Sequence, residues 1–326
     1  MKIIVDAFGG DNSPLAVIQG SADAVKDFGI TVILSGDEAK IKQVAKDNNV
    51  SLNGIEIIHS PSVIDIHEEP TSILKQHRDC SMAVGLQALA DDKGDAFVCA
   101  GSTGALIVGA TFIAKRMKGI KRPALAPVMP SESNYFMLLD AGANTDCRPE
   151  FLVQFAIMGT AYMKNVMGYQ NPRVGLLNIG AEDTKGRELE VEAYKLLKQA
   201  PINFVGNCEA RDIPSGKFDV IVSDGFTGNI ALKLYEGMAK FFGNELKSIL
   251  TSSLKSKIGA LFLLDRVNEF KAKVDYKEVG GAVLLGISKP VIKAHGSSDA
   301  RAFYNAIRQA KQCIDGKIID TIKDNI

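Results

Sequence analysis

Residues 96–110, with the sequence AFVCAGSTGALIVGA, decide the fold class. The apolar run 96–99 predicts a buried strand, Gly101 to Gly104 predict a tight loop, and the apolar residues 105–114 predict a helix. The same order of strand, glycine-containing loop and helix recurs along the chain. The predicted strands are residues 2–5, 96–99, 136–139, 174–177, 220–222 and 291–293. This repetition predicts an α/β fold, with a mostly parallel, doubly wound sheet and helices on both of its faces.

Several residues mark the expected starts of helices. Ser13 and Pro14 predict a capped start with proline at the first helical position. Pro149 and Asp299 mark two further starts, and residues 230–242 read as another helix. Because ligands bind beyond the carboxyl ends of parallel strands, we expect all the glycine loops to share one edge of the sheet.

Residues 243–278 differ from the rest, because the strand signal disappears and apolar residues fall at helical spacing. The apolar positions are Leu246, Ile249, Leu250, Leu254, Ile258, Leu261 and Leu264, and the basic residues between them are Lys247, Lys255, Lys257, Arg266, Lys271 and Lys273. We therefore expect a helical excursion from the sheet. No linker or repeat divides the chain, so residues 1–326 are predicted to form one α/β domain, with two interlocked subdomains left open.

The composition excludes several classes of protein. Lys and Arg number 38 and Asp and Glu number 38, so no overall basic field attracts nucleic acid. The five cysteines form no CxxC pair, which argues against a disulfide framework or a structural zinc site. Residues 1–14 do not read as a signal peptide, and no apolar run approaches the roughly 18 residues that span a bilayer. We therefore expect a cytoplasmic protein.

The common catalytic motifs are missing. The sequence contains no GxSxG elbow, no HExxH, no complete P-loop and no GxGxxG after its first strand. His59, His67, His77 and His295 have no metal-ligand spacing, so no metal site is predicted.

What remains is a set of glycine loops before helices. Glycine lets backbone N–H groups approach a ligand closely, and the first turn of a helix offers unpaired donors to an anion. Gly101 to Gly104 add the hydroxyls of Ser102 and Thr103, which suits a phosphate cradle. In the loop 223–229, the amide of Asn229 either binds a phosphate oxygen or a developing oxyanion, or caps the following helix. Any one such loop reads equally well as a tight turn.

Lys185 lies in a loop between Thr184 and Gly186, so its ammonium either reaches a ligand or is a solvated surface charge. Carboxylates also follow the predicted strands, at Asp6, Asp11, Asp140, Glu182, Asp183 and Asp224. Their spacing does not demand a metal.

Seven blocks, in this order, carry a family resemblance. They are DAFGGD at 6–11, GSTGA at 101–105, LDAGAN at 139–144, GLLNIG at 175–180 with Glu182 and Asp183, DGFTGN at 224–229, GGA at 280–282 and KAHGSS at 293–298. The set resembles the bacterial phosphate acyltransferases, which make acyl phosphate from acyl carrier protein for phospholipid synthesis. The blocks span nearly the whole chain, so the resemblance is specific although each block alone is weak.

The resemblance implies an isocitrate/isopropylmalate dehydrogenase-like fold, a homodimer, no cofactor, and a reversible transfer of a fatty acyl group from acyl-[acyl carrier protein] to inorganic phosphate. It also implies that Lys185 and Asn229 are the catalytic residues. The expected phosphate- and substrate-binding residues are Gly101, Ser102, Thr103, Gly104, Asp140, Asn144, Asp183, Asp224, Gly225, Thr227, Gly228 and His295. Phosphate is itself a nucleophile, which agrees with the missing triad. Our hypothesis is that Lys185, Asn229 and the amides of Gly101 to Gly104 orient phosphate for direct attack on the thioester.

The excursion then has two alternative roles. In the first, Lys255 and Lys257 dock the acidic carrier, and Leu261, Phe262 and Leu263 enter a membrane surface. Acyl phosphate would then pass to a membrane-embedded glycerol-3-phosphate acyltransferase. The alternative is that the segment packs in a dimer interface.

Three other functions stay open from the residues alone. One is a metal- and NAD-dependent decarboxylating dehydrogenase of the same fold. The second is acyl transfer through a cysteine thioester at Cys99 or Cys147. The third is a non-catalytic carrier- or lipid-binding module.

Overall fold

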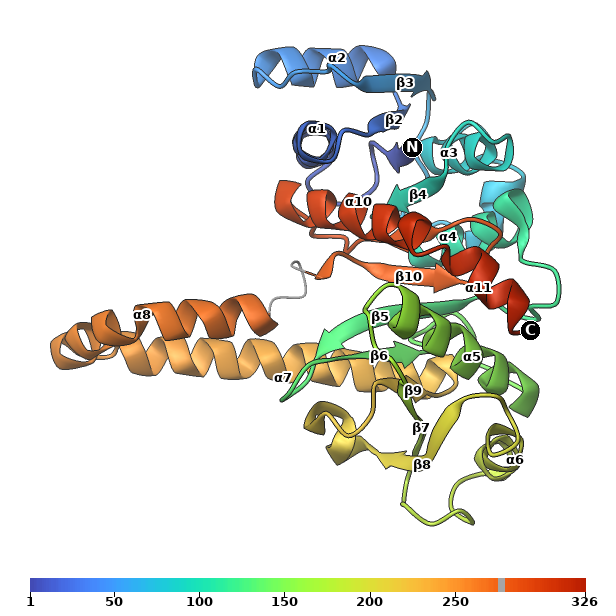
Figure 1. The fold of residues 1–326 in the computed structure, drawn as a ribbon. Helices are drawn as coiled ribbons and strands as arrows, with labels where there is room; N and C mark the ends of the chain where they lie inside the picture. The colour runs from blue at the N-terminus through green and yellow to red at the C-terminus, as the bar shows by residue number, and fades with distance from the viewer. Residues whose placement is uncertain (275–278) are drawn as a thin grey trace.

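The structure, a computed structural model, describes residues 1–274 and 279–326, with the side chains of all of these except residues 268 and 271–274. Its centre is a sheet of 11 described strands in the order β3-β2-β1-β4-β11-β10-β5-β6-β9-β7-β8 (Figure 1). The strands are β1 (Lys2–Asp6), β2 (Thr31–Gly36), β3 (Ile55–His59), β4 (Ala96–Cys99), β5 (Ala124–Pro130), β6 (Tyr135–Leu139), β7 (Arg173–Asn178), β8 (Asn203–Glu209), β9 (Val220–Val222), β10 (Ala282–Leu285) and β11 (Val291–Lys293).

Helices cover both faces of this sheet. They are α1 (Leu15–Phe28), α2 (Glu38–Asp47), α3 (Ser81–Ala90), α4 (Thr103–Gly109), α5 (Pro149–Asn165), α6 (Glu188–Leu197), α7 (Gly225–Thr251), α8 (Leu254–Val274), α10 (Ala300–Asp315) and α11 (Ile318–Asp324). Two 3₁₀ segments, η1 (Pro70–Leu74) and η3 (Ala210–Ser215), and one π-helical segment, η2 (Ala110–Lys115), complete the described elements. The predicted α/β architecture with a mostly parallel sheet is confirmed.

The strand directions divide the sheet into two halves. Seven neighbouring pairs are parallel, but the three successive pairs β11/β10, β10/β5 and β5/β6 are antiparallel. Three reversals in a row invert the direction of every strand beyond them. The carboxyl ends of β1, β4 and β11 therefore lie at one edge, called here the first edge, and those of β6, β9 and β7 lie at the opposite or second edge. The expectation that all glycine loops share one edge is wrong for this reason.

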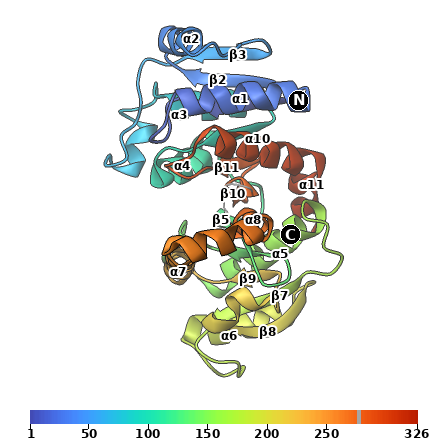
Figure 2. The same cartoon turned by 90° about the vertical axis from the view of Figure 1, so that its left-hand side faces the viewer.

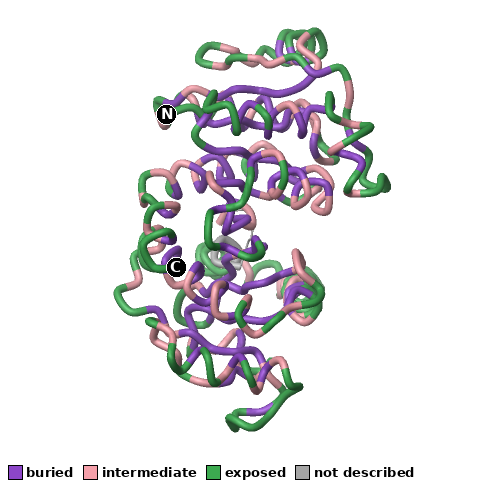
Figure 3. The backbone as a smooth tube through the Cα atoms, turned by 90° about the vertical axis from the view of Figure 1, so that its right-hand side faces the viewer, coloured by how far each residue is buried: buried purple, intermediate pink, exposed green. Residues whose placement is uncertain are grey.

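Alternate residues of each strand enter cores on opposite faces of the sheet, as the pleat requires. Ile3 and Val5 join the large cluster under α1, α5 and α10, whereas Ile4 faces α3 and α4. On that second face a separate cluster under α7 contains Ile221 and Leu232. Figure 3 shows the buried backbone concentrated in the strands, with the exposed segments around them. The second face thus has two helical layers, α3/α4 and α7, over different halves of the sheet.

The start of α7 differs from the prediction. The carboxylate of Asp224 accepts a hydrogen bond from the Thr227 nitrogen at 2.7 Å, so the helix begins at Gly225 and not at Ile230. Asn229 therefore lies in the second turn of the helix and does not cap it. The predicted cap of α1 is also wrong, because the Ser13 hydroxyl donates to Phe8 and Gly10 carbonyls instead. Asp299 does cap α10, as predicted.

The predicted excursion is a helical hairpin. α7 and α8 run side by side and extend well beyond the sheet, as the side view and the end-on view both show (Figures 1 and 2). Since α7 is continuous from Gly225, the hairpin and Asn229 belong to the same helix. Residues 275–278, and the side chains of Lys271 and Lys273, lie outside the described residues. None of the described helices is long and apolar enough to cross a membrane.

Candidate active site

Three loops meet at the first edge of the sheet: residues 6–11, 101–104 and 294–298. A Cβ on Gly9 would lie 2.7 Å from the Gly101 nitrogen, so glycine is needed where these two loops touch. The Asp11 nitrogen donates to the Gly296 carbonyl at 2.8 Å, which joins the third loop to the first. These first-edge loops form one continuous surface of backbone.

Charged groups lie beneath and beside the first-edge loops. The Lys293 ammonium donates to the carbonyls of Ala100 (3.1 Å) and Ala294 (2.5 Å), and burial lowers its pKa. Asp6 is 1% exposed and accepts a hydrogen bond from the Cys99 thiol at 3.1 Å. Burial raises the pKa of the Asp6 carboxyl. Lys293 therefore brings a cation to the point where two glycine loops meet.

α7 reaches the first edge from the other half of the sheet. The Tyr235 hydroxyl donates to the Pro130 carbonyl at the carboxyl end of β5, at 2.5 Å. Burial lowers the pKa of the His295 imidazole, Glu236 raises it, and the nearby cations Lys233 and Lys293 lower it further. Lys233 and Glu236 form an ion pair at 2.9 Å. Three cationic or titratable groups, Lys233, Lys293 and His295, thus gather beside the glycine loops.

At the second edge, Asp140 organises the loop that follows β6. This carboxyl is fully buried, which raises its pKa. One of its oxygens accepts N–H groups from Leu125, Gly142 and Ala143, and the other accepts the backbone and side-chain N–H groups of Asn144. The Asn144 amide also donates to the Pro123 carbonyl at 2.7 Å. Both Asp140 oxygens and the side-chain N–H groups of Asn144 are used within the protein, so these two residues shape the loop.

The first turn of α7 packs closely on this loop. The Gly225 nitrogen donates to the Asn144 carbonyl at 2.7 Å. A Cβ on Gly228 would lie only 1.9 Å from the Asp140 carbonyl oxygen, so no larger residue fits there without movement. Gly142 lies against the Asn229 side chain, whose Oδ1 would be 3.5 Å from a Cβ at that glycine. Asn229 is therefore held by close packing while its amide stays exposed.

The loop after β7 carries Lys185. The side-chain amides of Asn178 and Asn207 donate to the carbonyls of Lys185 (2.9 Å) and Glu182 (2.7 Å), which fixes the backbone of this loop. The ammonium of Lys185 is exposed, and it has no hydrogen bond or ion pair within the part of the chain that the structure describes. The Asp183 side chain is also exposed.

Arg187 joins the Lys185 loop to α7. Its guanidinium pairs with Glu190 in the first turn of α6 and with Asp224, the cap of α7. The Glu190 pair and the Asp224 pair both raise the pKa of Arg187. Asp224 also accepts the Thr227 hydroxyl at 3.0 Å, so its oxygens are used within the protein. Because β7 and β9 are neighbours, the loop that carries Lys185 and the start of α7 that carries Asn229 are adjacent and connected at the second edge.

One face of α7 connects the two edges. Asn229, Lys233 and Glu236 are spaced by four and three residues, so they lie on the same side of the helix. At about 1.5 Å of rise per residue, the seven residues from Asn229 to Glu236 cover about 10 Å. Lys233, Glu236 and Lys293 were missed by sequence reasoning. A predicted helix that begins at Gly225 would have placed Lys233 and Glu236 on the same face as Asn229.

Other groups give no support to alternative chemistries. Cys99 is fully buried and burial raises its pKa well above the ordinary range, while the pKa of Cys147 is raised to about 12 by burial and by Asp140. Both thiols are therefore poor nucleophiles. Among residues 1–274 and 279–326, no group of three His, Cys, Asp or Glu side chains could hold a metal ion.

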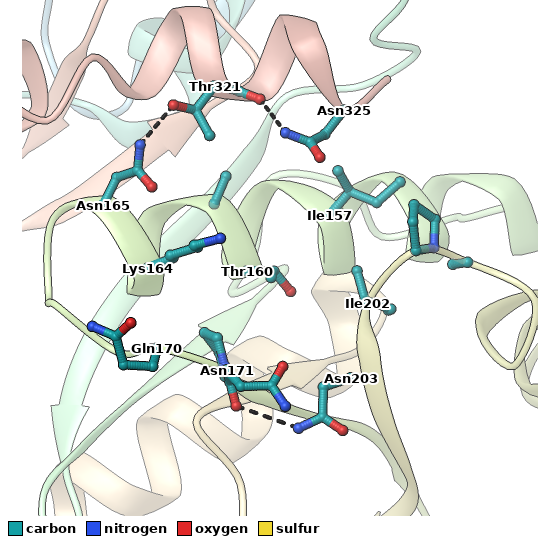
Figure 4. Close-up of a pocket in the computed structure, with 14 residues that line it drawn as sticks. Ile157, Thr160, Lys164, Asn165, Gln170, Asn171, Ile202, Asn203, Thr321 and Asn325 are labelled. Carbon is teal, nitrogen blue, oxygen red and sulfur yellow. Dashed lines mark hydrogen bonds between the residues drawn. The ribbon is translucent and has the colours of Figure 1, made fainter.

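A cavity of about 530 Å³ lies away from these loops, between the end of α5, the amino ends of β7 and β8, and α11. Figure 4 shows its polar lining, which includes Lys164, Asn165 and Asn203. No predicted site residue lines it. Its place at the amino ends of these strands is opposite to the usual ligand position.

Comparison with known proteins identifies the family. A family model described as "Fatty acid synthesis protein" matches residues 1–321. The chain is 48% identical over 327 residues to a curated phosphate acyltransferase of Clostridium botulinum (strain Langeland), covering 100% of this chain and 98% of the relative. It is 47% identical over 323 residues to the phosphate acyltransferase of Clostridium acetobutylicum, covering 99% and 98%.

The chain belongs to the phosphate acyltransferase family.

As a member of this family the protein is an acyltransferase, which gives the non-catalytic alternative no support. Its fold is similar to that of the EutD phosphotransacetylase from Staphylococcus aureus (TM-score 0.64, 18% identity, covering 96% of this chain and 94% of that one). A phosphotransacetylase from Streptococcus pyogenes gives a TM-score of 0.63 at 17% identity, covering 97% and 94%. At these identities the likeness concerns the fold alone.

Proposed function

We propose that this phosphate acyltransferase moves a fatty acyl group from acyl-[acyl carrier protein] to inorganic phosphate, reversibly forming acyl phosphate for phosphatidic acid and phospholipid synthesis. The observation that carries the proposal is the polar face of α7, which runs from Asn229 to the group of Lys233, Lys293 and His295 beside the first-edge glycine loops. An anion site and an amide donor are thereby joined along one helix.

Phosphate binds at the first edge in this proposal. The half-buried segment 102–104 supplies neutral donors through its amides and through the hydroxyls of Ser102 and Thr103, and Lys233 and His295 supply side-chain donors. A phosphate oxygen attacks the thioester carbonyl carbon, the carbon–sulfur bond breaks, and the carrier leaves as a thiolate that takes up a proton. No cofactor or metal enters this step.

The thioester enters from the second edge along the polar face of α7, so that its carbonyl lies between Asn229 and the bound phosphate, with the reacting atoms about 3–3.5 Å apart. Asn229 donates its amide N–H to the carbonyl oxygen as negative charge develops there, and Lys185 on the adjacent loop assists as a cation. Asp140, Asn144, Asp224 and Thr227, with Gly225 and Gly228, position Asn229 through the contacts described above. The reversal of strand direction separates Lys185 from residues 101–104, so we assign them to different parts of the substrate and not to one phosphate.

The direct assay is to mix acyl-[acyl carrier protein], phosphate and enzyme and to measure acyl phosphate. Asn229→Ala and Lys185→Ala should each lower kcat by about 10²–10³, the usual effect of losing one oxyanion donor, without unfolding the protein. Near-normal activity of both variants would remove these roles. Full activity of Cys99→Ser and Cys147→Ser is expected, and reduction of NAD with 2-hydroxy acids, the dehydrogenase alternative, is not.

We also propose a homodimer, built on one α/β unit of residues 1–326 with an isocitrate/isopropylmalate dehydrogenase-like arrangement. Phe226, Ile230 and Leu234 are 59%, 54% and 64% exposed and repeat every four residues along α7. An apolar stripe of this kind favours burial against a second copy. Leu234→Glu should shift the mass measured by light scattering from dimer to monomer, and an unchanged mass would contradict the interface.

The first half of α8 (Leu254–Val274), within the hairpin, is proposed as a membrane contact of an otherwise cytoplasmic protein. Leu261, Phe262 and Leu263 are 65%, 86% and 49% exposed, and Lys255 and Lys257 are exposed nearby to meet anionic lipid. Contact there would deliver acyl phosphate toward a membrane glycerol-3-phosphate acyltransferase. Leu261→Glu with Phe262→Glu should abolish flotation with anionic liposomes; unchanged recovery in the lipid fraction argues for dimer packing instead.

A further inference from the structure

The loop that enters β5 is strongly positive. Residues 115–122, with the sequence KRMKGIKR and called here the basic loop, contain five cations and no carboxylate. The cations are Lys115, Arg116, Lys118, Lys121 and Arg122, and all five are exposed. None of them is paired with a carboxylate of residues 1–274 or 279–326. Because the chain as a whole has equal numbers of acidic and basic residues, this excess of charge is local.

The basic loop is held rigidly by its uncharged residues. Met117 and Ile120 are 4% and 5% exposed and anchor the loop from within, and the Met117 nitrogen donates to the Gly286 carbonyl at 2.9 Å. The Gln154 side chain accepts the Lys121 N–H at 2.8 Å and donates to the Gly119 carbonyl at 2.9 Å. A surface fixed in this way loses little conformational entropy on binding a partner.

The basic loop lies next to the second-edge part of the candidate active site. It leads directly into Pro123, whose carbonyl accepts the Asn144 amide, and into Leu125, whose nitrogen donates to Asp140 at 2.9 Å. Asp140 and Asn144 belong to the loop after β6, and Gly142 of that loop packs against the Asn229 side chain. In Figure 1 this side of the molecule is where α7 starts, away from the tip of the α7–α8 hairpin.

We propose that the basic loop is the docking surface for the acidic face of the acyl carrier protein. The inference rests on the proposed function and adds the place at which the carrier binds. A carrier docked there faces the second edge, from which the thioester enters the site. The hairpin lysines are much more distant, since the 22 residues from Asn229 to Thr251 alone cover about 33 Å of helix.

An anionic bilayer is the other partner that a basic surface attracts. A carrier protein fits better because the two apolar residues of the basic loop, Met117 and Ile120, point into the core. The loop therefore offers no apolar side chain for insertion, whereas membrane-bound surfaces combine basic residues with exposed apolar ones. Beside the basic loop, Phe112 (64% exposed) and Ile326 (45% exposed, against Gly119) are single apolar side chains, whereas three consecutive ones, Leu261 to Leu263, are in the hairpin.

The test is a triple charge reversal, Lys118→Glu, Lys121→Glu and Arg122→Glu, assayed with acyl-[acyl carrier protein]. Electrostatic steering of a charged partner is worth about 10–10³ in association, so the KM for the carrier substrate should rise about 10- to 100-fold. The kcat at saturation and the KM for phosphate should stay within about twofold, because these rim residues contact neither phosphate nor the reacting carbonyl. A triple reversal of exposed lysines on α1 and α2, Lys26→Glu, Lys40→Glu and Lys46→Glu, is the matched control and should change nothing.

Binding of unacylated carrier protein, measured by calorimetry, separates this proposal from the proposed function. If the wild type neither binds carrier nor forms acyl phosphate, the proposed function itself fails. If the wild type does both and the triple variant keeps its carrier KM and affinity, the docking surface is elsewhere. A larger effect from Lys255→Glu with Lys257→Glu would place it on the hairpin.

Two further readouts close the remaining possibilities. If the triple variant loses binding to phosphatidylglycerol vesicles but keeps its carrier KM, the basic loop is a lipid surface and the proposal is wrong. If the triple variant does not fold, the milder Lys118→Gln with Lys121→Gln replaces it. That variant should raise the carrier KM about 3- to 10-fold and flatten its dependence on salt; an unchanged KM and salt dependence again overturns the proposal.

Discussion

Gly228→Ala is the perturbation whose effect follows most directly from the coordinates. The added Cβ would lie 1.9 Å from the Asp140 carbonyl oxygen, a distance that is not relieved by any side-chain rotation because the obstacle is backbone. Contacts below 3.0 Å are essentially never seen for a Cβ, so the start of α7 and the Asp140 loop must separate by about 1 Å. Asn229, one residue further along, moves with the helix.

The expected effect is large on activity and small on stability. Overpacking of this kind costs about 1–3 kcal/mol, and the better helix propensity of alanine offsets about 0.5–1 kcal/mol of it. A net loss of about 0–2.5 kcal/mol lowers Tm by at most a few degrees in a chain of this size. A displacement of about 1 Å at a reacting group can lower the rate about 10²-fold. We therefore expect kcat to fall about 100-fold in a protein that is still folded.

The same helix offers a matched control. No atom lies within 4 Å of a Cβ built on Gly237, so Gly237→Ala should leave kcat unchanged and raise stability by about 0.5–1 kcal/mol. Thermal unfolding and the acyl phosphate assay, run on both variants, give the comparison. A Gly228→Ala protein with wild-type kcat would refute the view that the contact with Asp140 sets the position of Asn229.

Three further predictions test other parts of the site. Arg187→Met removes the partner of Glu190 and the buried Asp224, so kcat should fall at least tenfold with a stability loss of about 1–3 kcal/mol, measured by urea unfolding; an unaffected kcat would mean that the Lys185 loop and α7 need no link. Burial raises the pKa of the Asp6 carboxyl above 3.8, so the unfolded protein releases this proton at a lower pH than the folded protein does. The free energy of unfolding of the wild type should therefore fall as pH rises from 3.8 through the raised pKa. Asp6→Asn should flatten this dependence in denaturation curves taken between about pH 4 and 7. Lys293→Met should raise the KM for phosphate at least tenfold while the carrier KM changes little, and equal changes in both would argue against a phosphate site at the first edge.

Local signals explain why parts of the fold were predictable. The strands at 96–99, 220–222 and 291–293 are predicted to the residue, because each is a short apolar run ended by a loop of glycine and polar residues. β5 was missed since it contains Pro127 and Pro130, which normally argue against a strand. β5 pairs antiparallel with both β10 and β6, and the second of these pairs gives the far half of the sheet its opposite direction. Pairing direction is a long-range property that no local pattern encodes.

The site was predictable as a set of loops but not as an arrangement. The Phe226 to Asn229 segment reads as a loop because glycine and threonine have low helix propensity. The helix forms there because Asp224 caps it and the glycines allow close contact with Asp140, which are tertiary effects. Because the helix was predicted to begin at Ile230, Asn229, Lys233 and Glu236 were not predicted to lie on one helix face. The roles of Lys185 and Asn229 stay predictions.

The central claim is that phosphate, held beside the first-edge loops, takes the acyl group directly from the thioester. The most direct measurement is the release of free carrier thiol from acyl-[acyl carrier protein] by a stoichiometric amount of enzyme, with and without phosphate. We predict no release without phosphate, and complete release with equal formation of acyl phosphate when phosphate is added. One equivalent of free carrier per enzyme in the absence of phosphate would reveal an acyl-enzyme and contradict direct attack.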